Sequence, residues 1–278
     1  MNTLLALETA DTTCGVAVWH DGECQAEAHI HRPRVHAARL TPLIEETLDH
    51  ADVAASQVEA VAVSAGPGSY TGLRIGMSSA KGFAMAVGCP LVTVPTLEAA
   101  AHALAPWASP GDMVVAALDA RRNDVFAAAY IATDVAGGSI TPIPTHEAWT
   151  EAVEAGPYGV DDLADAVEQQ LHGSITLWYT GPGAAKAAAP LQMRTEETRA
   201  HEARGRGMEE HAMPNNKNDK TGQSRRVRVA PSEHRRLSAR EVARRGIARA
   251  QQGALQDPCD VEPAYLKAFH GTPPAKSV

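Results

Sequence analysis

The segment with the most specific pattern for ligand binding is a glycine-rich loop at residues 64–76, SAGPGSYTGLRIG. An apolar run precedes it at residues 58–63, and an apolar stretch rich in glycine and alanine follows it to residue 87. Glycines let a backbone approach a ligand closely, and a helix N-terminus attracts anions. The loop lacks the GK[ST] ending of a P-loop and is not the GxGxxG fingerprint on a first strand. A tight turn before a closely packed helix explains the same pattern, so both interpretations stay open.

Polar residues also follow the first apolar run, residues 3–7, where the sequence continues ETADTT. The hydroxyls and carboxylates of Thr9, Asp11 and Thr12 have the chemistry to contact a phosphate. The same residue types cap turns, and we favour that interpretation. A second glycine turn, TGPG at residues 180–183, precedes an alanine-rich stretch.

Three histidines suggest a metal site as a rival hypothesis. His29 and His31 would share one face of a strand, with His36 nearby, but no cysteine or carboxylate at ligand spacing completes the set. We favour an exposed histidine edge. Asp119 and Asp124 flank two arginines, which indicates a salt-bridged turn rather than an acid/base dyad. No Ser/His/Asp or Cys/His arrangement stands out, so we predict no catalytic residues and no metal ligands.

The elements that would position these residues occur twice along the chain. An opening strand is followed by a pair joined at Asp21-Gly22, which is a strong hairpin signal, and then by an amphipathic helix at residues 36–50. A similar strand pair restarts at residues 113–132, residues 145–171 look helical in pieces, and a strand, glycine turn and helix recur from residue 175. We therefore predict an α/β protein with an N-terminal lobe at residues 1–109 and a C-terminal lobe at residues 110–278.

Composition indicates a globular cytoplasmic protein. The chain has 278 residues, of which 44% are hydrophobic, enough for a substantial core. Its four cysteines are scattered without a CxxC pair, which fits a reducing compartment. The first residues lack the basic region of a signal peptide, and no apolar run has the length of a membrane span.

The net charge of −8 is unevenly distributed, because residues 194–249 carry 15 Lys and Arg against 8 Asp and Glu. Within that region, residues 194–232 are polar and aperiodic, and we expect them to form a disordered basic insertion. Its arginines have the charge to contact nucleic-acid phosphates, but a solvated insertion is the favoured interpretation.

Four ordered motifs carry a resemblance to a known family: LLALETADTT, GPGSYTGLRIG, ALDARRNDVFAAAY and VEPAYLKAF. Together they resemble the TsaB (YeaZ) family across nearly the whole chain except residues 194–232. The resemblance implies two RNase H-like lobes of the actin-like ATPase (ASKHA) superfamily, with mixed sheets flanked by helices.

The resemblance also implies a position for a nucleotide between the lobes. In the superfamily the first strand ends in an acidic residue that holds a metal and nucleotide, and Glu8 stands where the family usually has Asp. The extra methylene puts metal binding in doubt. No cofactor is required on this interpretation, and ATP or ADP with Mg is the ligand such a cleft would take. The candidate residues are Glu8, Thr9, Thr12, Gly66, Gly68, Ser69, Gly181 and Gly183.

The related protein TsaD carries a His-x-x-x-His helix that binds the catalytic metal. The matching helix here has His36 but Leu40 at the second ligand position, which removes the chelate. The resemblance therefore implies a non-catalytic subunit that binds and activates TsaD, which modifies the anticodon-adjacent adenosine of tRNA. TsaE is the implied third partner, tRNA binds through the complex, and a homodimer is expected when TsaD is missing.

By resemblance, TsaD binds the helix that begins at His36 and the helix from Leu73. Small residues on the second helix permit close approach of another helix, although packing on the chain's own sheet explains part of them. The predicted interface consists of His36, Leu40, Leu43, Leu73, Gly76, Met77, Ala80 and Phe83. Two alternatives are an independent actin-fold ATPase or kinase that uses Glu8 and the glycine loops, and, less favoured, a glycoprotease-type peptidase.

Overall fold

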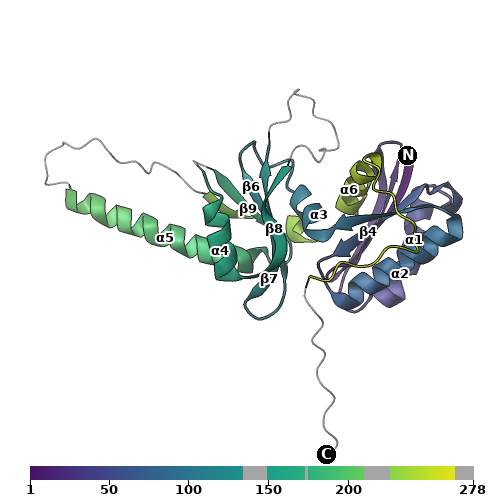
Figure 1. Cartoon of the computed structure of the whole chain (residues 1–278), viewed down its shortest axis with the longest axis horizontal. Helices are drawn as coiled ribbons and strands as arrows, with labels where there is room; N and C mark the ends of the chain where they lie inside the picture. The colour runs from purple at the N-terminus through teal and green to yellow at the C-terminus, as the bar shows by residue number, and fades with distance from the viewer. Residues whose placement is uncertain (134–148, 173–174, 210–225, 267–278) are drawn as a thin grey trace, which may run out of the picture.

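The computed structural model describes residues 1–133, 149–172, 175–209 and 226–266, with the backbone alone for residues 198–209. Two five-stranded mixed sheets form the centres of two lobes (Figure 1). The first sheet has the order β3-β2-β1-β4-β5. Its strands are β1 (Thr3–Glu8), β2 (Thr13–His20), β3 (Glu23–His31), β4 (Ala60–Gly66) and β5 (Leu91–Pro95). The strands β1, β2 and β3 are antiparallel, whereas β4 and β5 run parallel to β1.

The second sheet repeats this topology with the order β10-β9-β6-β7-β8. Its strands are β6 (Met113–Asp119), β7 (Asp124–Ala132), β8 (Trp149–Gly159), β9 (Thr176–Thr180) and β10 (Arg226–Val229). Again three strands form an antiparallel meander and two run parallel to the first of them. The prediction that both lobes begin alike, with mixed sheets flanked by helices, is confirmed.

Helices cover both sheets. On the first sheet α1 (His36–His50) and α2 (Tyr70–Val87) pack against β2 and β4, and α4 (Val160–Gln169) and α5 (Ala184–Glu209) occupy the corresponding places in the second lobe. The start and end of α2 follow from sequence. Ser69 accepts a hydrogen bond from the Gly72 amide, and Gly88 ends the helix with φ of 76°.

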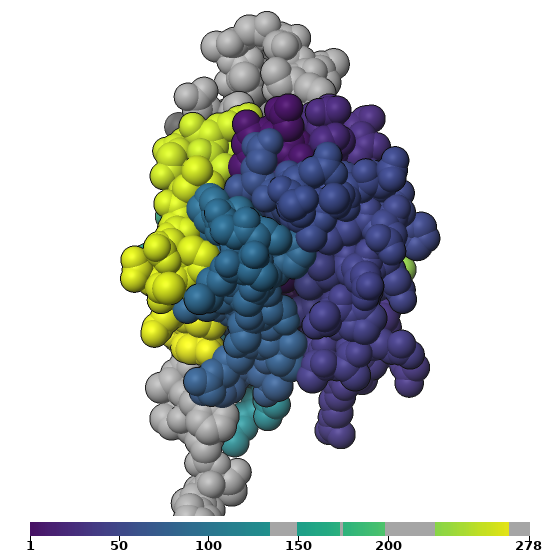
Figure 2. All heavy atoms as spheres, turned by 90° about the vertical axis from the view of Figure 1, so that its right-hand side faces the viewer, coloured from purple at the N-terminus to yellow at the C-terminus, as the bar shows by residue number. Residues whose placement is uncertain are grey.

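Two further helices are exchanged between the lobes. The helix α3 (Thr96–His102) follows the last strand of the first sheet, yet it packs mainly on β6 and β7 of the second. Conversely, α6 (Ala239–Gln251) follows the last strand of the second sheet and packs on β1 and β2. In Figure 2 the yellow atoms of the C-terminal segment accordingly lie beside those of the N-terminal third.

This exchange corrects the predicted domain composition. Residues 110–278 do not all belong to the second lobe, because Val242, Ala243 and Ile247 of α6 are buried in one cluster with Leu4 and Ala6 of β1. The apolar stripe of α6 needs a face to cover, and the first sheet leaves the side opposite α1 and α2 for it.

Two other predictions are also corrected. Residues 194–232 contain structure at both ends, since α5 continues to Glu209 and β10 pairs with β9 in parallel register. Sheet pairing supplies the partners that this polar segment lacks on its own. The middle of the predicted insertion lies outside the described residues. In addition, β8 is an edge strand where the sequence indicated pieces of helix, because pairing with β7 overrides local propensity. No helix in the described ranges has both the length and the hydrophobicity to cross a bilayer.

Candidate functional site

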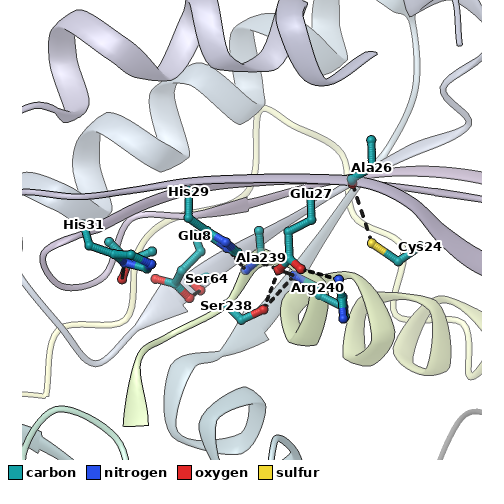
Figure 3. A network of polar contacts seen from close by, with 11 residues as sticks. Glu8, Cys24, Ala26, Glu27, His29, His31, Ser64, Ser238, Ala239 and Arg240 are labelled. Atoms are coloured by element: carbon teal, nitrogen blue, oxygen red, sulfur yellow. Dashed lines mark hydrogen bonds and ion pairs between the residues drawn. The ribbon is translucent and has the colours of Figure 1, made fainter. Parts of the chain in front are cut away.

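The end of β1 forms a buried polar cluster with the glycine-rich loop. The side chain of Glu8 is 1% exposed, and its carboxylate accepts a short hydrogen bond from the Ser64 hydroxyl. Its Oε1 atom also accepts from the Ala10 amide at 2.6 Å. Figure 3 shows Glu8 and Ser64 directed at one another beneath β3. The carboxylate is thus held inside the first lobe by the chain itself.

Burial changes the ionisation of this group. Desolvation raises the pKa of the Glu8 carboxyl from its ordinary 4.5 to about 7, although the bonds from Ser64 and Ala10 favour the charged form. A carboxyl with this pKa is protonated in a large fraction of molecules at neutral pH. Both of its oxygens have partners within the chain, one in the Ser64 hydroxyl and the other in the Ala10 amide.

The loop glycines serve close packing against the turn after β1. A Cβ atom on Gly68 would overlap the Ala10 carbonyl, and one on Gly72 would overlap the carbonyl of Thr9. Gly76 is in the same situation, because its Cβ would overlap the Thr9 hydroxyl. These contacts favour the close-packed turn over a phosphate cradle.

Other members of the predicted nucleotide set have local roles. Ser69 caps α2, and the exposed Thr12 bonds Asp11 at 3.2 Å. Gly66 lines a shallow pocket together with Asp260 and Glu262 of the C-terminal segment. In the same segment, the Ala264 amide donates a hydrogen bond to the Ala65 carbonyl at 2.7 Å. Two acidic side chains at this pocket would repel a polyphosphate.

The second glycine turn repeats this packing in the other lobe. A Cβ on Gly181 would overlap the Ala117 carbonyl, and one on Gly183 would overlap the backbone of Leu118. The neighbouring Asp119 bonds Lys186 at 2.8 Å, and this hydrogen bond lowers the pKa of its carboxyl. The turn is therefore salt-bridged as predicted, but its partner is the α5 lysine rather than the turn arginines.

We expect Glu8→Gln to stabilise the folded chain more strongly as the pH rises. Between pH 4.5 and about 7 the unfolded chain loses a proton that folded Glu8 retains, so the wild type loses stability with rising pH. The variant should gain about 3 kcal/mol at pH 8 and little at pH 4.5, because each pKa unit of the shift is worth about 1.4 kcal/mol. Urea denaturation at the two pH values measures this gain, with the exposed Glu45→Gln as control. An equal effect of Glu8→Gln at both values would contradict the raised pKa.

The three histidines contact other residues of the chain and do not converge on one common ligand. His29 and His31 stack on one face of β3, with ring centroids 5.6 Å apart, as the strand period predicts. The His29 Nε2 atom accepts from the Ala239 amide at 3.1 Å, and buried His36 bonds the Thr13 carbonyl at 3.0 Å. Burial lowers the pKa of His29, which fits its role as an acceptor. In the described ranges no group of three His, Cys, Asp or Glu side chains is placed to hold a metal.

A polar network at the start of α6 was not found from sequence. The Glu27 carboxylate accepts from the Ser238 hydroxyl at 2.7 Å and from the Arg240 amide at 3.1 Å. It also forms an ion pair with the Arg240 guanidinium at 2.7 Å (Figure 3). The serine at residue 238 is a visible N-cap signal, but nothing in the sequence connects it to a strand more than 200 residues earlier.

Most of the predicted partner interface is buried in the chain's own core. Leu40, Leu43, Leu73, Met77 and Ala80 are all under 9% exposed. His36 and Gly76 are also buried, and Phe83 is half-buried against the same core. The seven buried residues therefore pack on the first sheet and are not available to a partner, whereas Phe83 stays partly accessible.

The exposed sides of α1 and α2 carry other residues. We define the outer face of these helices by exposed positions spaced three or four residues apart. Its middle consists of Ala38, Thr41, Pro42, Ser78, Gly82 and Met85, and the charged Glu45 and Arg74 border it at the same spacing. Helical periodicity was the signal that could have separated this face from the buried one. Met85 is 62% exposed, and the other five residues of the middle are small or uncharged, so the face allows close approach of another surface.

Comparison with known proteins gives matches over about half of the chain. The family model described as TsaD, tRNA N6-adenosine threonylcarbamoyltransferase, matches residues 30–150. The tRNA threonylcarbamoyladenosine biosynthesis protein TsaB of Escherichia coli is 37% identical over 128 residues, 46% of this chain and 54% of that protein. TsaB of Haemophilus influenzae is 40% identical over 126 residues, 45% of this chain and 52% of that protein. The chain thus spans about half the length of these curated relatives.

Solved structures show the same fold over nearly the whole chain. YeaZ from Pseudomonas aeruginosa superimposes with a TM-score of 0.64 at 22% identity, covering 96% of this chain and all of that one. A second crystal structure, of a protein with similarity to peptidase YeaZ from Pseudomonas aeruginosa, gives a TM-score of 0.66 at 23% identity with the same coverage. At these identities the likeness shows the shared architecture.

Proposed function

We infer that the chain belongs to the TsaB (YeaZ) family, and on this premise we propose that it is a non-catalytic subunit that binds and activates TsaD. The complex would form the threonylcarbamoyl group on the anticodon-adjacent adenosine of tRNAs that read codons beginning with adenine. The observation that carries the proposal is the outer face of α1 and α2, which lies within the segment matched by the TsaD family model.

The composition of this face supports helix packing by a partner. Exposed Ala38, Ser78 and Gly82 let a second helix pair approach closely, and Met85 adapts its shape to an apolar contact. The buried sides of α1 and α2 pack in the core of the first lobe, so the outer face lies on rigid elements.

The cluster around Glu8 supports the non-catalytic part of the proposal. Its carboxyl has a pKa of about 7 and is bonded internally, and the loop glycines accommodate the chain's own backbone. An independent ATPase or kinase would need the oxygens of that carboxylate free for a metal and that loop accessible. Any ATP or ADP with Mg in the cleft would then be dispensable for transfer.

The remaining partners follow from the same proposal. TsaE joins as the third protein, tRNA binds the complex, and the outer face forms a homodimer when TsaD is missing. A cytoplasmic location fits these partners and the chain's free cysteines, none of which is paired within the described residues.

Co-expression with TsaD of the same organism tests this assembly. We expect Thr41→Arg and Ser78→Arg to abolish co-elution, because each places a charge on the outer face, while leaving the melting temperature of the isolated chain unchanged. Gln169→Arg, on the exposed side of α4, is the matched control and should co-elute like the wild type. Full co-elution of both outer-face variants would refute the proposed surface.

A further inference from the structure

A chain of aromatic and basic side chains crosses the junction of α3, β9 and β10. The Arg228 guanidinium lies 5.2 Å from the ring of Trp178, which meets Trp107 edge-on at 6.2 Å between centroids. The Trp107 ring in turn meets the His234 ring edge-on, with 4.3 Å between their centroids. Only 4% of the whole chain is aromatic, so two tryptophans in one cluster are a local concentration.

The fold holds this cluster at the edge of the second sheet. Arg228 pairs with Trp178 in the parallel register of β10 and β9, which places both side chains on the same face. The Thr180 hydroxyl donates to the His234 carbonyl at 2.9 Å and fixes the segment after β10. Trp107 remains 40% exposed, so its ring is available to a ligand.

The same edge carries an excess of positive charge. Residues 226–236 contain four arginines and one acidic residue, Glu233. Arg226, Arg228 and Arg236 are exposed, and Arg235 is half-buried. Ion pairs occupy the arginines of α6, including Arg240 and Arg244, but within the described ranges none involves the arginines of residues 226–236. Their charge is therefore free to attract an anionic partner.

We propose that Trp107, Trp178, Arg226, Arg228 and His234 form an RNA-binding surface. Exposed aromatic rings beside unpaired arginines are the combination that binds single-stranded nucleic acid, with bases stacked on the rings and phosphates held by guanidinium groups. Trp107 offers the stacking ring, Arg228 lies against the neighbouring Trp178, and Arg226 is two residues away on the same face of β10. The ligand class is RNA with unstacked bases, such as a loop.

This surface deepens the proposed function by giving the chain its own contact with the tRNA substrate. It lies on the second lobe, whereas the outer face proposed for TsaD lies on the first. Substitutions on the two surfaces should therefore impair different properties, RNA binding in one case and TsaD binding in the other. A variant of the RNA surface should still co-elute with TsaD, and an outer-face variant should still bind RNA.

Fluorescence anisotropy with a labelled anticodon stem-loop RNA and the isolated full-length chain tests the inference. We expect Trp107→Ala to weaken binding about tenfold, the order measured for loss of one stacked base. Trp107→Phe should retain most of the affinity. The pair Arg226→Glu with Arg228→Glu should weaken binding of all RNA sequences and reduce its salt dependence, because phosphate contacts are lost.

The pair Arg121→Glu with Arg122→Glu, which makes the same charge change in the exposed turn between β6 and β7, is the matched control and should bind like the wild type. A circular dichroism melt confirms that each variant is folded. Absence of RNA binding by the wild type, or unchanged binding by Trp107→Ala and the double arginine variant, would overturn the inference. Binding of polyglutamate with the same losses would also overturn it, in favour of an acidic protein partner.

Discussion

Gly72→Ala is expected to lower the free energy of unfolding by about 3 kcal/mol, at the upper end of overpacking effects. The new methyl group would overlap the carbonyl oxygen of Thr9, which belongs to the backbone of the turn after β1. A backbone atom cannot change rotamer to make room, so α2 or the turn must shift. Urea denaturation of the isolated chain measures the loss.

A second glycine of the same helix provides the control. Gly82 is exposed, and a Cβ there meets nothing within 4 Å. Gly82→Ala should therefore stabilise the chain by up to about 1 kcal/mol through helix propensity. Equal effects of the two substitutions would show that Gly72 is not packed against the β1 turn, and the structural explanation of the glycine loop would fail.

Arg245→Met is expected to destabilise the chain by about 3–5 kcal/mol. Arg245 of α6 is fully buried, and its Nε atom donates to the Glu98 carboxylate of α3 at 2.9 Å. A second, shorter bond joins its guanidinium to the same oxygen. Loss of this arginine would leave a carboxylate that is only 6% exposed without its main counter-charge.

Two comparisons separate this effect from general damage. Arg249 also approaches Glu98, but at 3.4 Å and with a side chain 25% exposed, so Arg249→Met should cost less than about 1 kcal/mol. Adding Glu98→Leu to Arg245→Met removes the unpaired charge and should recover much of the loss. If the double variant were as unstable as the single one, packing rather than charge would explain the result.

The repeated organisation of the chain was predictable because it depends on local patterns. The Asp21-Gly22 turn fixed the opening hairpin, and the spacing of Leu40, Leu43 and Leu48 gave the bounds of α1. The restart near Met113 gave the second sheet for the same reason. Hydrophobic period and turn residues act over a few positions, so they are visible in a single sequence.

Long-range packing was not predictable in this way. Nothing near Ala239 indicates that α6 leaves its own lobe to cover the first sheet, and nothing near Glu27 indicates that it binds the start of that helix. The partner face was predictable, by contrast. The resemblance indicates which helices bind the partner, and the period of each helix places Leu43 and Ala80 against the sheet and their neighbours on the exposed side.

Reconstitution with purified components distinguishes a subunit that supports tRNA modification from one that catalyses it. Threonylcarbamoyl transfer from threonylcarbamoyl-AMP to tRNA would be measured with TsaD and TsaE, in the absence of this chain and with the wild type, Ser78→Arg or Glu8→Gln. We expect transfer only with the wild type and Glu8→Gln, and none by the chain without TsaD. Transfer that is abolished by Glu8→Gln, while co-elution with TsaD persists, would contradict this expectation.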